Sequence, residues 1–400
     1  MVKRKNKTMI KQLSSEQFKS FYKRMYEEFP ESEMKSLMEF TDLLDEGKYI
    51  CLGYFEGDVQ KGYALGCLTS KKFFWLDYLH IFKENQNGGY GSILLKEILN
   101  DVAKRGIFLE TEVLDSDDYF DNKQRRMRFY DKFNIHQVDC PYLFPCADGT
   151  YIDSLNLKYI PAQGVTRLKK EELQEAIREC VSTIHKALPH AQEVMNKYID
   201  EVKDLEIHIF SLTDVNMDDE KELEDIGRLI YYTDPYVYPA FYDNDIEMAK
   251  KSAKSLLCRD TLFNHKNIKV GRIDGKVAGF MVILTKYPKN NRKEMTLAFK
   301  ETFDKLTPRF DEVMEGYFDT LDYEWEGIQI MSLAVLPEYR KMRVATKMLN
   351  SLPSKNTYSL ACVKDNLKAR ELYRKCGYEF KFEYPGFTGI MCVELVRKGK

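Results

Sequence analysis

The sequence predicts an α/β (α+β) protein with two tandem domains, each a mixed, mostly antiparallel sheet flanked by helices. The chain has 400 residues, which is more than one hydrophobic core usually holds, so two domains are expected. In both halves β-rich runs alternate with helical periodicity, and the order of these elements repeats. A charged helical stretch separates the halves. The predicted boundaries are 1–161, 162–205 for the helical connector, and 206–400.

The first domain is predicted to begin with a helix and a hairpin, and then to alternate strands with helices. Apolar residues at helical spacing follow Ser15, which is expected to cap the first helix. The β-rich runs YICLGYF and KGYALGCLT are joined by EGDVQ, as in a hairpin. Gly106 is expected to end a later helix. The predicted elements are helices over 14–30, 90–106 and 122–133, a hairpin over 49–69, and strands over 73–82, 107–114 and 154–161.

The second domain repeats this order after the connector. Its clearest element is a hairpin over 267–285, in which Asp274 and Gly275 have the composition of a tight type I′ turn. A charged helical insertion over 291–321 follows the hairpin. The remaining predicted elements are strands over 207–212, 328–337, 357–363 and 390–397, helix and loop over 219–242, and helices over 339–352 and 366–378.

Composition and charge exclude several classes of protein. Hydrophobic residues make up 44% and charged residues 31% of the chain, as in soluble globular proteins. With 61 Lys and Arg against 63 Asp and Glu, the net charge of -2 does not favour nucleic-acid binding. The basic start MVKRKNK lacks the apolar segment of a signal peptide, and no apolar run is long enough to span a membrane. We therefore expect a cytoplasmic protein without nucleic-acid or membrane partners.

The cysteines and histidines give no sign of a metal site. The nine cysteines and six histidines are dispersed, and the cysteines form no CxxC pair. Cys140 and Cys146 come closest, in CPYLFPC. We expect reduced thiols and no structural metal.

A cluster of glycines stands where a helix must begin, in ENQNGGYGSILLKEIL. Glycine destabilises helices, so the presence of Gly88, Gly89 and Gly91 at this place requires an explanation. The start of a helix offers unpaired N–H groups and a partial positive charge, and glycines allow phosphate oxygens to approach the backbone closely. The segment lacks the Lys-Ser/Thr of a nucleotide P-loop and the spacing of a dinucleotide fingerprint. It is interpreted as a cradle for a phosphate group.

The second half carries an altered copy of this segment. LHIFKENQNGGYGS aligns without a gap with LAVLPEYRKMRVAT, from Leu79 with Leu333 to Ser92 with Thr346. Downstream, RRMRFYDKFNI and KARELYRKCGY place Tyr130 opposite Tyr373. In the second copy Arg340 replaces Gln86, and Arg343 replaces Gly89.

These motifs resemble those of the GCN5-related N-acetyltransferases (GNAT superfamily), whose acyl-CoA loop reads Gln/Arg-x-x-Gly-x-Gly/Ala between a strand and a helix. Gln86, Gly89 and Gly91 fit this pattern, and the likeness extends over both halves. DNLKARELYRKCGYEF looks like the family's Asn-x-x-Ala-x-x-Leu-Tyr-x-x-x-Gly-Phe segment, with Tyr378 in place of Phe. Since Lys341 and Arg343 would crowd a pyrophosphate, the second loop is either degenerate or rebuilt around Arg343.

The resemblance implies that acetyl-CoA is the acyl donor and that the first half binds it. In such a site the backbone after the strand bulge would pair with pantetheine and polarise the thioester, and the loop would hold the pyrophosphate. The residues assigned to the cofactor are Ile81, Phe82, Gln86, Asn87, Gly88, Gly89, Tyr90, Gly91 and Ser92.

The resemblance also implies an acid and a base. Tyr130 matches the tyrosine that protonates the leaving thiolate, and Asp77 matches the central-strand carboxylate that deprotonates the amine. Met331 stands at the corresponding position of the second half and cannot take a proton, which favours the first half as the active one.

Three other residues rival Asp77 as the base. Strand alternation would place Asp77 with Leu79 and Ile81 on one face and His80 on the other, so His80 is a candidate only if its own face borders the cleft. Glu110 and Glu112 share a face of the next strand and are further candidates.

The predicted reaction is acetylation of a primary amine of a small molecule by direct attack in a ternary complex. Acceptor residues remain open: Asp115, Asp117 and Asp118 could attract an amine, and Arg125, Arg126 or Arg128 an anion. YYTDPYVYPAFY could line an aromatic pocket or form a packing surface. Alternatives are two active halves or an active C-terminal half alone, a non-catalytic acyl-CoA sensor, and a pseudoenzyme. The expected state is a monomer or homodimer.

Overall fold

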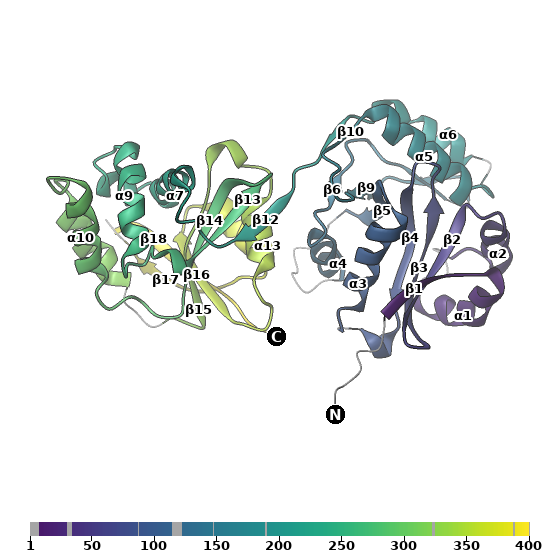
Figure 1. Ribbon diagram of the computed structural model, residues 1–400, viewed down its shortest axis with the longest axis horizontal. Coiled ribbons are helices and arrows are strands. Elements are labelled where there is room, and N and C mark those ends of the chain that lie inside the picture. The colour runs from purple at the N-terminus through teal and green to yellow at the C-terminus, as the bar shows by residue number, and fades with distance from the viewer. Residues whose placement is uncertain are drawn as a thin grey trace. The chain divides into compact units, whose positions relative to one another are not determined.

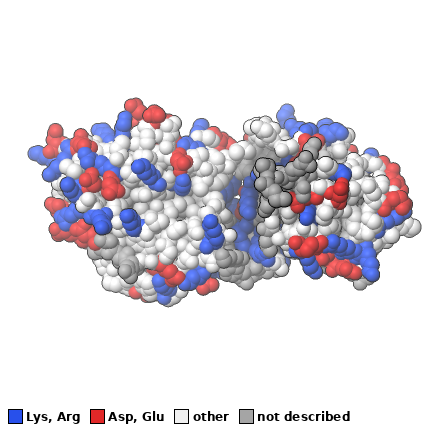
Figure 2. Space-filling model, turned by 60° about the horizontal axis from the view of Figure 1, so that its bottom comes forward, with Lys and Arg blue, Asp and Glu red and all other residues white. Residues whose placement is uncertain are grey.

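The structure is a computed structural model that forms two compact units, 1–115 with 126–207 and 116–125 with 208–400 (Figure 1). It describes residues 8–29, 34–86, 88–113, 122–146, 148–188, 190–321, 325–386 and 389–399. In these ranges no helix is long and apolar enough to cross a membrane. Both signs of charge are interspersed on the face shown in Figure 2.

The first unit is built on a seven-stranded sheet in the order β1-β2-β3-β4-β5-β9-β6. Neighbouring strands run antiparallel except for β4 and β5, which are parallel. The strands are β1 (Thr8–Leu13), β2 (Tyr49–Glu56), β3 (Val59–Leu68), β4 (Phe73–Ile81), β5 (Gly106–Glu112), β6 (His136–Gln137) and β9 (Leu155–Ile160), with small sheets of β7 (Phe144–Pro145) and β8 (Tyr151–Ile152) and of β10 (Arg167–Leu168) and β11 (Leu205–Glu206).

Helices cover both faces of this sheet (Figure 1). The core on one face includes side chains of α1, α2 and α5, and the core on the other includes side chains of α3 and α4. The helical elements are α1 (Ser15–Glu28), α2 (Leu37–Asp45), η2 (Lys83–Asn85), α3 (Tyr90–Glu97), the π-turn η3 (Ile98–Val102), α4 (Asn122–Asp131), α5 (Lys170–Ile184), α6 (Ala191–Asn196) and η4 (Ile199–Glu201).

Two local expectations about these helices were wrong. Ser14, and not Ser15, caps α1, because the Ser14 hydroxyl accepts the Gln17 N–H while the Gln17 side chain accepts the Ser14 N–H. Gly106 does not end a helix, because the helical turns end at Val102 and Gly106 begins β5 with a left-handed φ of 114°.

The helices expected as a connector over 162–205 contribute to the core of the first unit. Leu173, Ile177 and Cys180 of α5 lie in the same cluster as Trp75 of β4. The amphipathic face of α5 is therefore buried against the sheet of the first unit, which extends to residue 207.

The second unit repeats the architecture of the first. Its sheet has the order β12-β13-β14-β15-β16-β18-β17, with β15 and β16 parallel, so the prediction of two copies of one fold is confirmed. The predicted hairpin is also confirmed, because Asp274 and Gly275 have φ values of 52° and 79°. The strands are β12 (Phe210–Thr213), β13 (Ile268–Ile273), β14 (Lys276–Leu284), β15 (Ile328–Val335), β16 (Tyr358–Val363), β17 (Glu379–Pro385) and β18 (Met391–Arg397).

The helices of the second unit include those of the predicted insertion. They are α7 (Glu220–Thr233), α8 (Tyr238–Phe241), α9 (Ile246–Cys258), η5 (His265–Asn267), α10 (Asn291–Thr302), α11 (Phe310–Gly316), η6 (Phe318–Leu321), η7 (Pro337–Tyr339), α12 (Val344–Ser351) and α13 (Leu367–Lys375).

Candidate functional site

Both sheets open at the pair of parallel strands. In the first unit β4 and β5 pair only where Phe73–Trp75 face 106–108, and beyond Trp75 the strand β4 pairs with β3 alone. In the second unit β15 and β16 pair only over 328–330 and 358–360. In each unit the two parallel central strands therefore move apart beyond this short paired stretch. We call this opening the splay, and side chains from both strands can face a substrate there.

A β-bulge decides where Asp77 points. On β3, Leu65 faces Tyr78 and Gly66 faces Leu76, so Asp77 is the extra residue of β4. The bulge interrupts the alternation of side chains. Asp77 therefore contacts Tyr49, in the cluster that also holds Tyr78, and the predicted grouping of Asp77 with Leu79 and Ile81 was wrong. Met331 is the bulged residue of β15, at the corresponding place.

Asp77 is held by two partners that the sequence did not reveal. Its Oδ2 accepts hydrogen bonds from Lys35 Nζ (2.7 Å) and from Tyr49 Oη (2.7 Å). The Lys35 and Asp77 side chains are only 17% and 14% exposed, so the ion pair is largely shielded from solvent. The carboxylate is thereby held in place on its strand, beside a positive charge.

Glu110 of β5 is the second carboxylate at the splay. Its Oε1 accepts a hydrogen bond from Tyr142 Oη (2.7 Å) and its Oε2 accepts one from Trp75 Nε1 (3.1 Å). Burial, followed by the negative charge of Asp77, raises the pKa of Glu110 to about 7. A carboxylate with this pKa can accept and release a proton near neutral pH, which marks Glu110 as a strong candidate base.

The other two rivals are less suited. Glu112 forms an ion pair with Arg126 (2.5 Å) near the end of β5. His80 lies among the rings of Phe29, Tyr63 and Phe82, and burial lowers its pKa, so its imidazole stays neutral.

The glycine loop has the backbone that an anion cradle needs. Gly89 caps α3 in the left-handed conformation (φ 78°), and a Cβ built there would meet no atom within 4 Å. At Gly91 a Cβ would lie 3.5 Å from the Phe129 ring. The first turn of α3 therefore presents its N–H groups to an open space that suits a phosphate. Asn87, which was assigned to the same cradle, lies outside the described residues.

The backbone expected to pair with pantetheine already has partners. The Gln86 side chain donates to the Ile81 carbonyl (3.0 Å), and the Phe82 N–H donates to the Lys61 carbonyl (3.0 Å). The Phe82 carbonyl accepts from the Asn85 N–H (2.7 Å). Of these groups, the Ile81 carbonyl is held only by a side chain, which a ligand can replace most easily.

The altered loop of the second unit keeps the same backbone. Arg343 caps α12 with φ 59°, as Gly89 caps α3, and Lys341 is also left-handed (φ 69°). This conformation costs a residue with a Cβ about 1 kcal/mol. The second unit therefore retains the shape of the cradle while two long cationic side chains extend from it.

The two matching tyrosines are both buried. Burial raises the pKa of Tyr130, on α4, to about 12, so its hydroxyl stays protonated and can donate. Tyr130 belongs to the core on the face of α3 and α4, whereas Asp77 and Glu110 contact the other core. Burial also raises the pKa of Tyr373, on α13, whose surroundings include Cys362. In the first unit the candidate acid and bases thus approach the splay from opposite faces.

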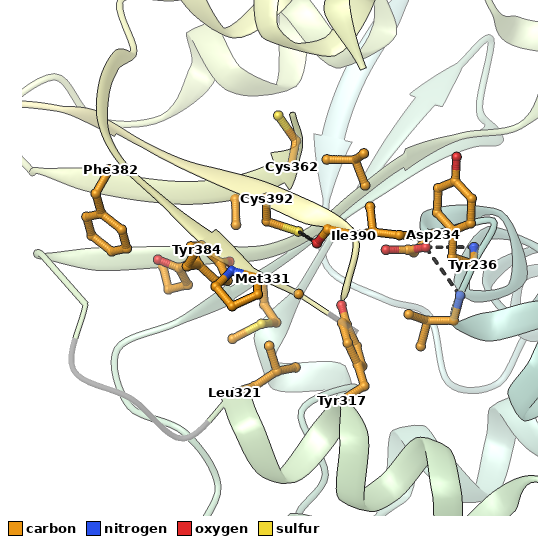
Figure 3. A pocket seen from close by; sticks show the side chains of 16 residues that line it. Asp234, Tyr236, Tyr317, Leu321, Met331, Cys362, Phe382, Tyr384, Ile390 and Cys392 are labelled. Carbon is orange, nitrogen blue, oxygen red and sulfur yellow. Dashed lines mark hydrogen bonds between the residues drawn. The ribbon is translucent and has the colours of Figure 1, made fainter. Parts of the chain in front are cut away.

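In the second unit the splay opens into a pocket of about 350 Å³ (Figure 3). Met331 and Ala361 line it, and by strand register they occupy the places of Asp77 and Glu110. The small side chain of Ala361 leaves room where the first unit holds the Glu110 carboxylate. The segment YYTDPYVYPAFY supplies Asp234, Tyr236 and Val237 to the wall, whereas its Tyr238, Phe241 and Tyr242 pack in the hydrophobic core.

The acceptor residues considered in the first half are only partly described. Asp115, Asp117 and Asp118 lie outside the described residues. Arg125 and Arg126 are on α4, where Arg125 donates to Asn122 Oδ1 (3.3 Å) and Arg126 is paired with Glu112. No group of three or more His, Cys, Asp or Glu in the described part of the chain could hold a metal ion.

Comparison with known proteins finds one family model that matches part of the chain. Residues 310–380 match the model of the acetyltransferase (GNAT) domain, a range that includes the splay, the altered loop and α13 of the second unit. No protein of curated function matches the chain.

Several solved structures are similar to parts of the chain. One is a Bacteroides thetaiotaomicron protein described as belonging to the GNAT family (21% identity, 44% of this chain and 97% of that chain, TM-score 0.37). Another is an N-acetyltransferase from Staphylococcus aureus Mu50 (19% identity, 46% and 99%, TM-score 0.37). A third is the ribosomal-protein-S18-alanine N-acetyltransferase of Escherichia coli (14% identity, 40% and 96%, TM-score 0.31).

Proposed function

Because the chain carries an acetyltransferase (GNAT) domain, we propose that it is an acetyl-CoA-dependent N-acetyltransferase acting on a primary amine of a small molecule. The acceptor amine attacks directly, in a ternary complex. We assign the transfer to the first unit. The observation that carries this assignment is the pair of carboxylates, Asp77 and Glu110, held where β4 and β5 part.

The residues present fit the acyl donor. Gly88, Gly89 and Gly91 leave the start of α3 open, and a Cβ at Gly88 would lie 2.8 Å from the Tyr90 ring. In the proposed complex the loop from Gln86 to Ser92 holds the pyrophosphate, with Asn87 and Tyr90 part of it, and Ile81 and Phe82 border the pantetheine. When bound, acetyl-CoA supplies the activated acetyl group as a thioester.

The proposed chemistry has two proton transfers, one from the amine to a base and one from an acid to the leaving sulfur. Glu110 accepts the proton that the amine loses as its nitrogen bonds to the acetyl carbon. Tyr130 donates a proton to the sulfur as the carbon–sulfur bond breaks. Asp77, which the sequence favoured as the base, is paired with Lys35, so we assign it the role of holding negative charge beside Glu110. Proton transfer of this kind contributes about 10²- to 10⁴-fold to a rate.

A second candidate is transfer by the C-terminal half. Its support is the pocket at the splay of the second unit, together with the family match over 310–380. In that case Tyr373 is the acid, and the loop around Arg343 binds the donor through its cationic side chains.

Two tyrosine variants separate the candidates. Release of free CoA from acetyl-CoA is measured with a panel of small primary amines, for the wild type and for Tyr130→Phe and Tyr373→Phe. We expect kcat to fall about 100-fold in Tyr130→Phe, because the proton donor is lost, and to stay within about twofold of wild type in Tyr373→Phe. The reverse pattern would assign the transfer to the C-terminal half. Tight binding of CoA without release for any amine would favour a sensor.

A further inference from the structure

The pocket of the second unit has a chemical character of its own. Asp234 is the only charged side chain among the described residues that line it. Lys, Arg and His do not occur in that lining, so a carboxylate or phosphate would enter without a counter-charge. A pocket of about 350 Å³ also fits a small molecule and not a polymer. The lining therefore excludes anionic ligands and favours a small cationic one.

Asp234 is held in a fixed orientation that leaves one oxygen for a ligand. Its Oδ1 accepts hydrogen bonds from the backbone N–H groups of Tyr236 (2.8 Å) and Val237 (3.3 Å), in the turn that leads into α8. Both bonds end on Oδ1, as Figure 3 shows, so Oδ2 is not engaged by this turn. Burial raises the pKa of Asp234, and an ammonium group bound at Oδ2 would compensate the buried charge.

The rest of the wall suits a ring. Tyr317, Phe382 and Tyr384 contribute aromatic side chains, and Met331 and Ala361 contribute apolar ones. Figure 3 shows Asp234 near one end of the pocket and Phe382 near the other. A ligand that satisfies both ends therefore has a charged nitrogen at one end and a flat apolar body at the other, for which aromatic walls are favourable.

We propose that this pocket binds a small aromatic amine, with its protonated nitrogen at Asp234 Oδ2 and its ring among Tyr317, Phe382 and Tyr384. The site lies at the splay of the second unit, where the first unit carries the carboxylates Asp77 and Glu110 instead. This inference does not depend on which unit transfers the acetyl group. It concerns binding, and its test contains no acyl donor.

The test compares three probes of similar shape and different charge. 2-Phenylethylamine, 2-phenylethanol and 3-phenylpropanoate are titrated calorimetrically into the full chain at pH 7.5. We expect the amine to bind, the alcohol to bind more weakly, and the anion not to bind. Absence of amine binding at millimolar concentration, or equal binding of the anion, would overturn the proposal.

Two variants locate the site. In Asp234→Asn the side-chain oxygen can still accept from the turn, so the fold is preserved while the charge is lost. Affinity for the amine should fall about tenfold, the effect of losing a hydrogen bond between charged groups, while affinity for the alcohol should change less than about threefold. Ala361→Phe, which fills the pocket, should abolish binding of both. Equal amine affinity in wild type and Asp234→Asn would refute the role of Asp234.

A matched control is available in the same unit. Asp245 caps α9 by accepting the Glu247 N–H (2.8 Å) and does not line the pocket. Asp245→Asn removes one negative charge from the unit in a similar backbone setting, so it should leave amine affinity at the wild-type value. If Asp245→Asn weakens the amine as much as Asp234→Asn, the effect is one of net charge and the proposed site is wrong.

Discussion

Glu110 has a built-in optical reporter, because the indole of Trp75 donates a hydrogen bond to its Oε2 (3.1 Å). The chain has two tryptophans, and the other, Trp325, belongs to the second unit. A Trp325→Phe background therefore isolates the emission of Trp75. We expect this emission to change with pH around a midpoint near 7, the raised pKa of Glu110, and to lose that transition in Glu110→Gln.

The same substitution should change stability in a way that depends on pH. The ordinary pKa of Glu110 is 4.5 and its pKa in the folded protein is about 7. At 1.36 kcal/mol per pH unit, ionisation in the folded state costs at most about 3 kcal/mol. Since the pKa is raised on folding, the protein loses this stability as pH rises from 4.5 to 7, and the loss stays constant above that. Glutamine mimics the protonated side chain of Glu110. The Tyr142 hydroxyl, which donates a hydrogen bond to the carboxylate, can instead accept one from the glutamine NH₂ group.

Urea unfolding of the first unit, followed by Trp75 emission, measures this effect. We expect Glu110→Gln to raise the free energy of unfolding by less than about 1 kcal/mol at pH 5 and by about 3 kcal/mol at pH 8. Glu112→Gln, on the same strand but paired with Arg126, controls for loss of any β5 carboxylate. An equal difference at pH 5 and pH 8, or emission of Trp75 without an inflection, would refute the raised pKa.

The activity of Glu110→Gln should move in the opposite direction to its stability. If Glu110 is the base, the variant loses acetyl transfer while it becomes more stable above pH 7, as expected for a group whose strain serves function. An active Glu110→Gln would return the role of base to Asp77, whose own test is the loss of activity in Asp77→Asn.

Three further predictions concern the loops and the buried ion pair. Gly89→Arg should abolish binding of acetyl-CoA to the first unit, measured by calorimetry. Gly47→Arg should leave this binding unchanged, although Gly47 has the same left-handed backbone and equally open surroundings. Binding that survives Gly89→Arg would place the donor elsewhere. Lys35→Met should lower the free energy of unfolding by about 3 kcal/mol, because Asp77 is left buried without its cation. Adding Asp77→Asn to this variant should restore most of the lost stability. An unchanged urea midpoint in Lys35→Met would contradict the prediction. Lys341→Gly should raise stability by up to about 1 kcal/mol, since glycine tolerates the left-handed backbone; a lower thermal midpoint would show that the lysine side chain stabilises the loop.

Local patterns in the sequence were sufficient for most of the fold. Helical periodicity located α1, α3 and α7, and the Asp274-Gly275 turn located the hairpin of β13 and β14. The repeated order of elements predicted the two matching sheets. β17 was not predicted, although its sequence EFKFEYP alternates charged and aromatic residues as a strand does, and almost every residue in it is exposed.

The place of the glycine cluster at the start of a helix was also predicted from the sequence, because its signal is local. Glycine is the residue expected where a backbone turns left-handed at the start of a helix, and Gly89 does so. The same reasoning could not show that Arg343 adopts this conformation, since a residue with a Cβ gives no local sign of it.

The chemistry at the splay was decided by the tertiary structure. The bulge that turns Asp77 toward Tyr49 depends on the register between β3 and β4, which one strand alone does not encode. The raised pKa of Glu110 depends on burial and on Asp77, which lies on another strand. Likewise, Asp234 meets Ala361 in one pocket only because the second unit folds. The sequence by itself determined most of the elements and how often the plan repeats, since periodicity and turn chemistry act over a few residues. Only the tertiary structure decided which charges share a buried site, because the desolvation and Coulomb energies that set their protonation arise between residues far apart in the chain.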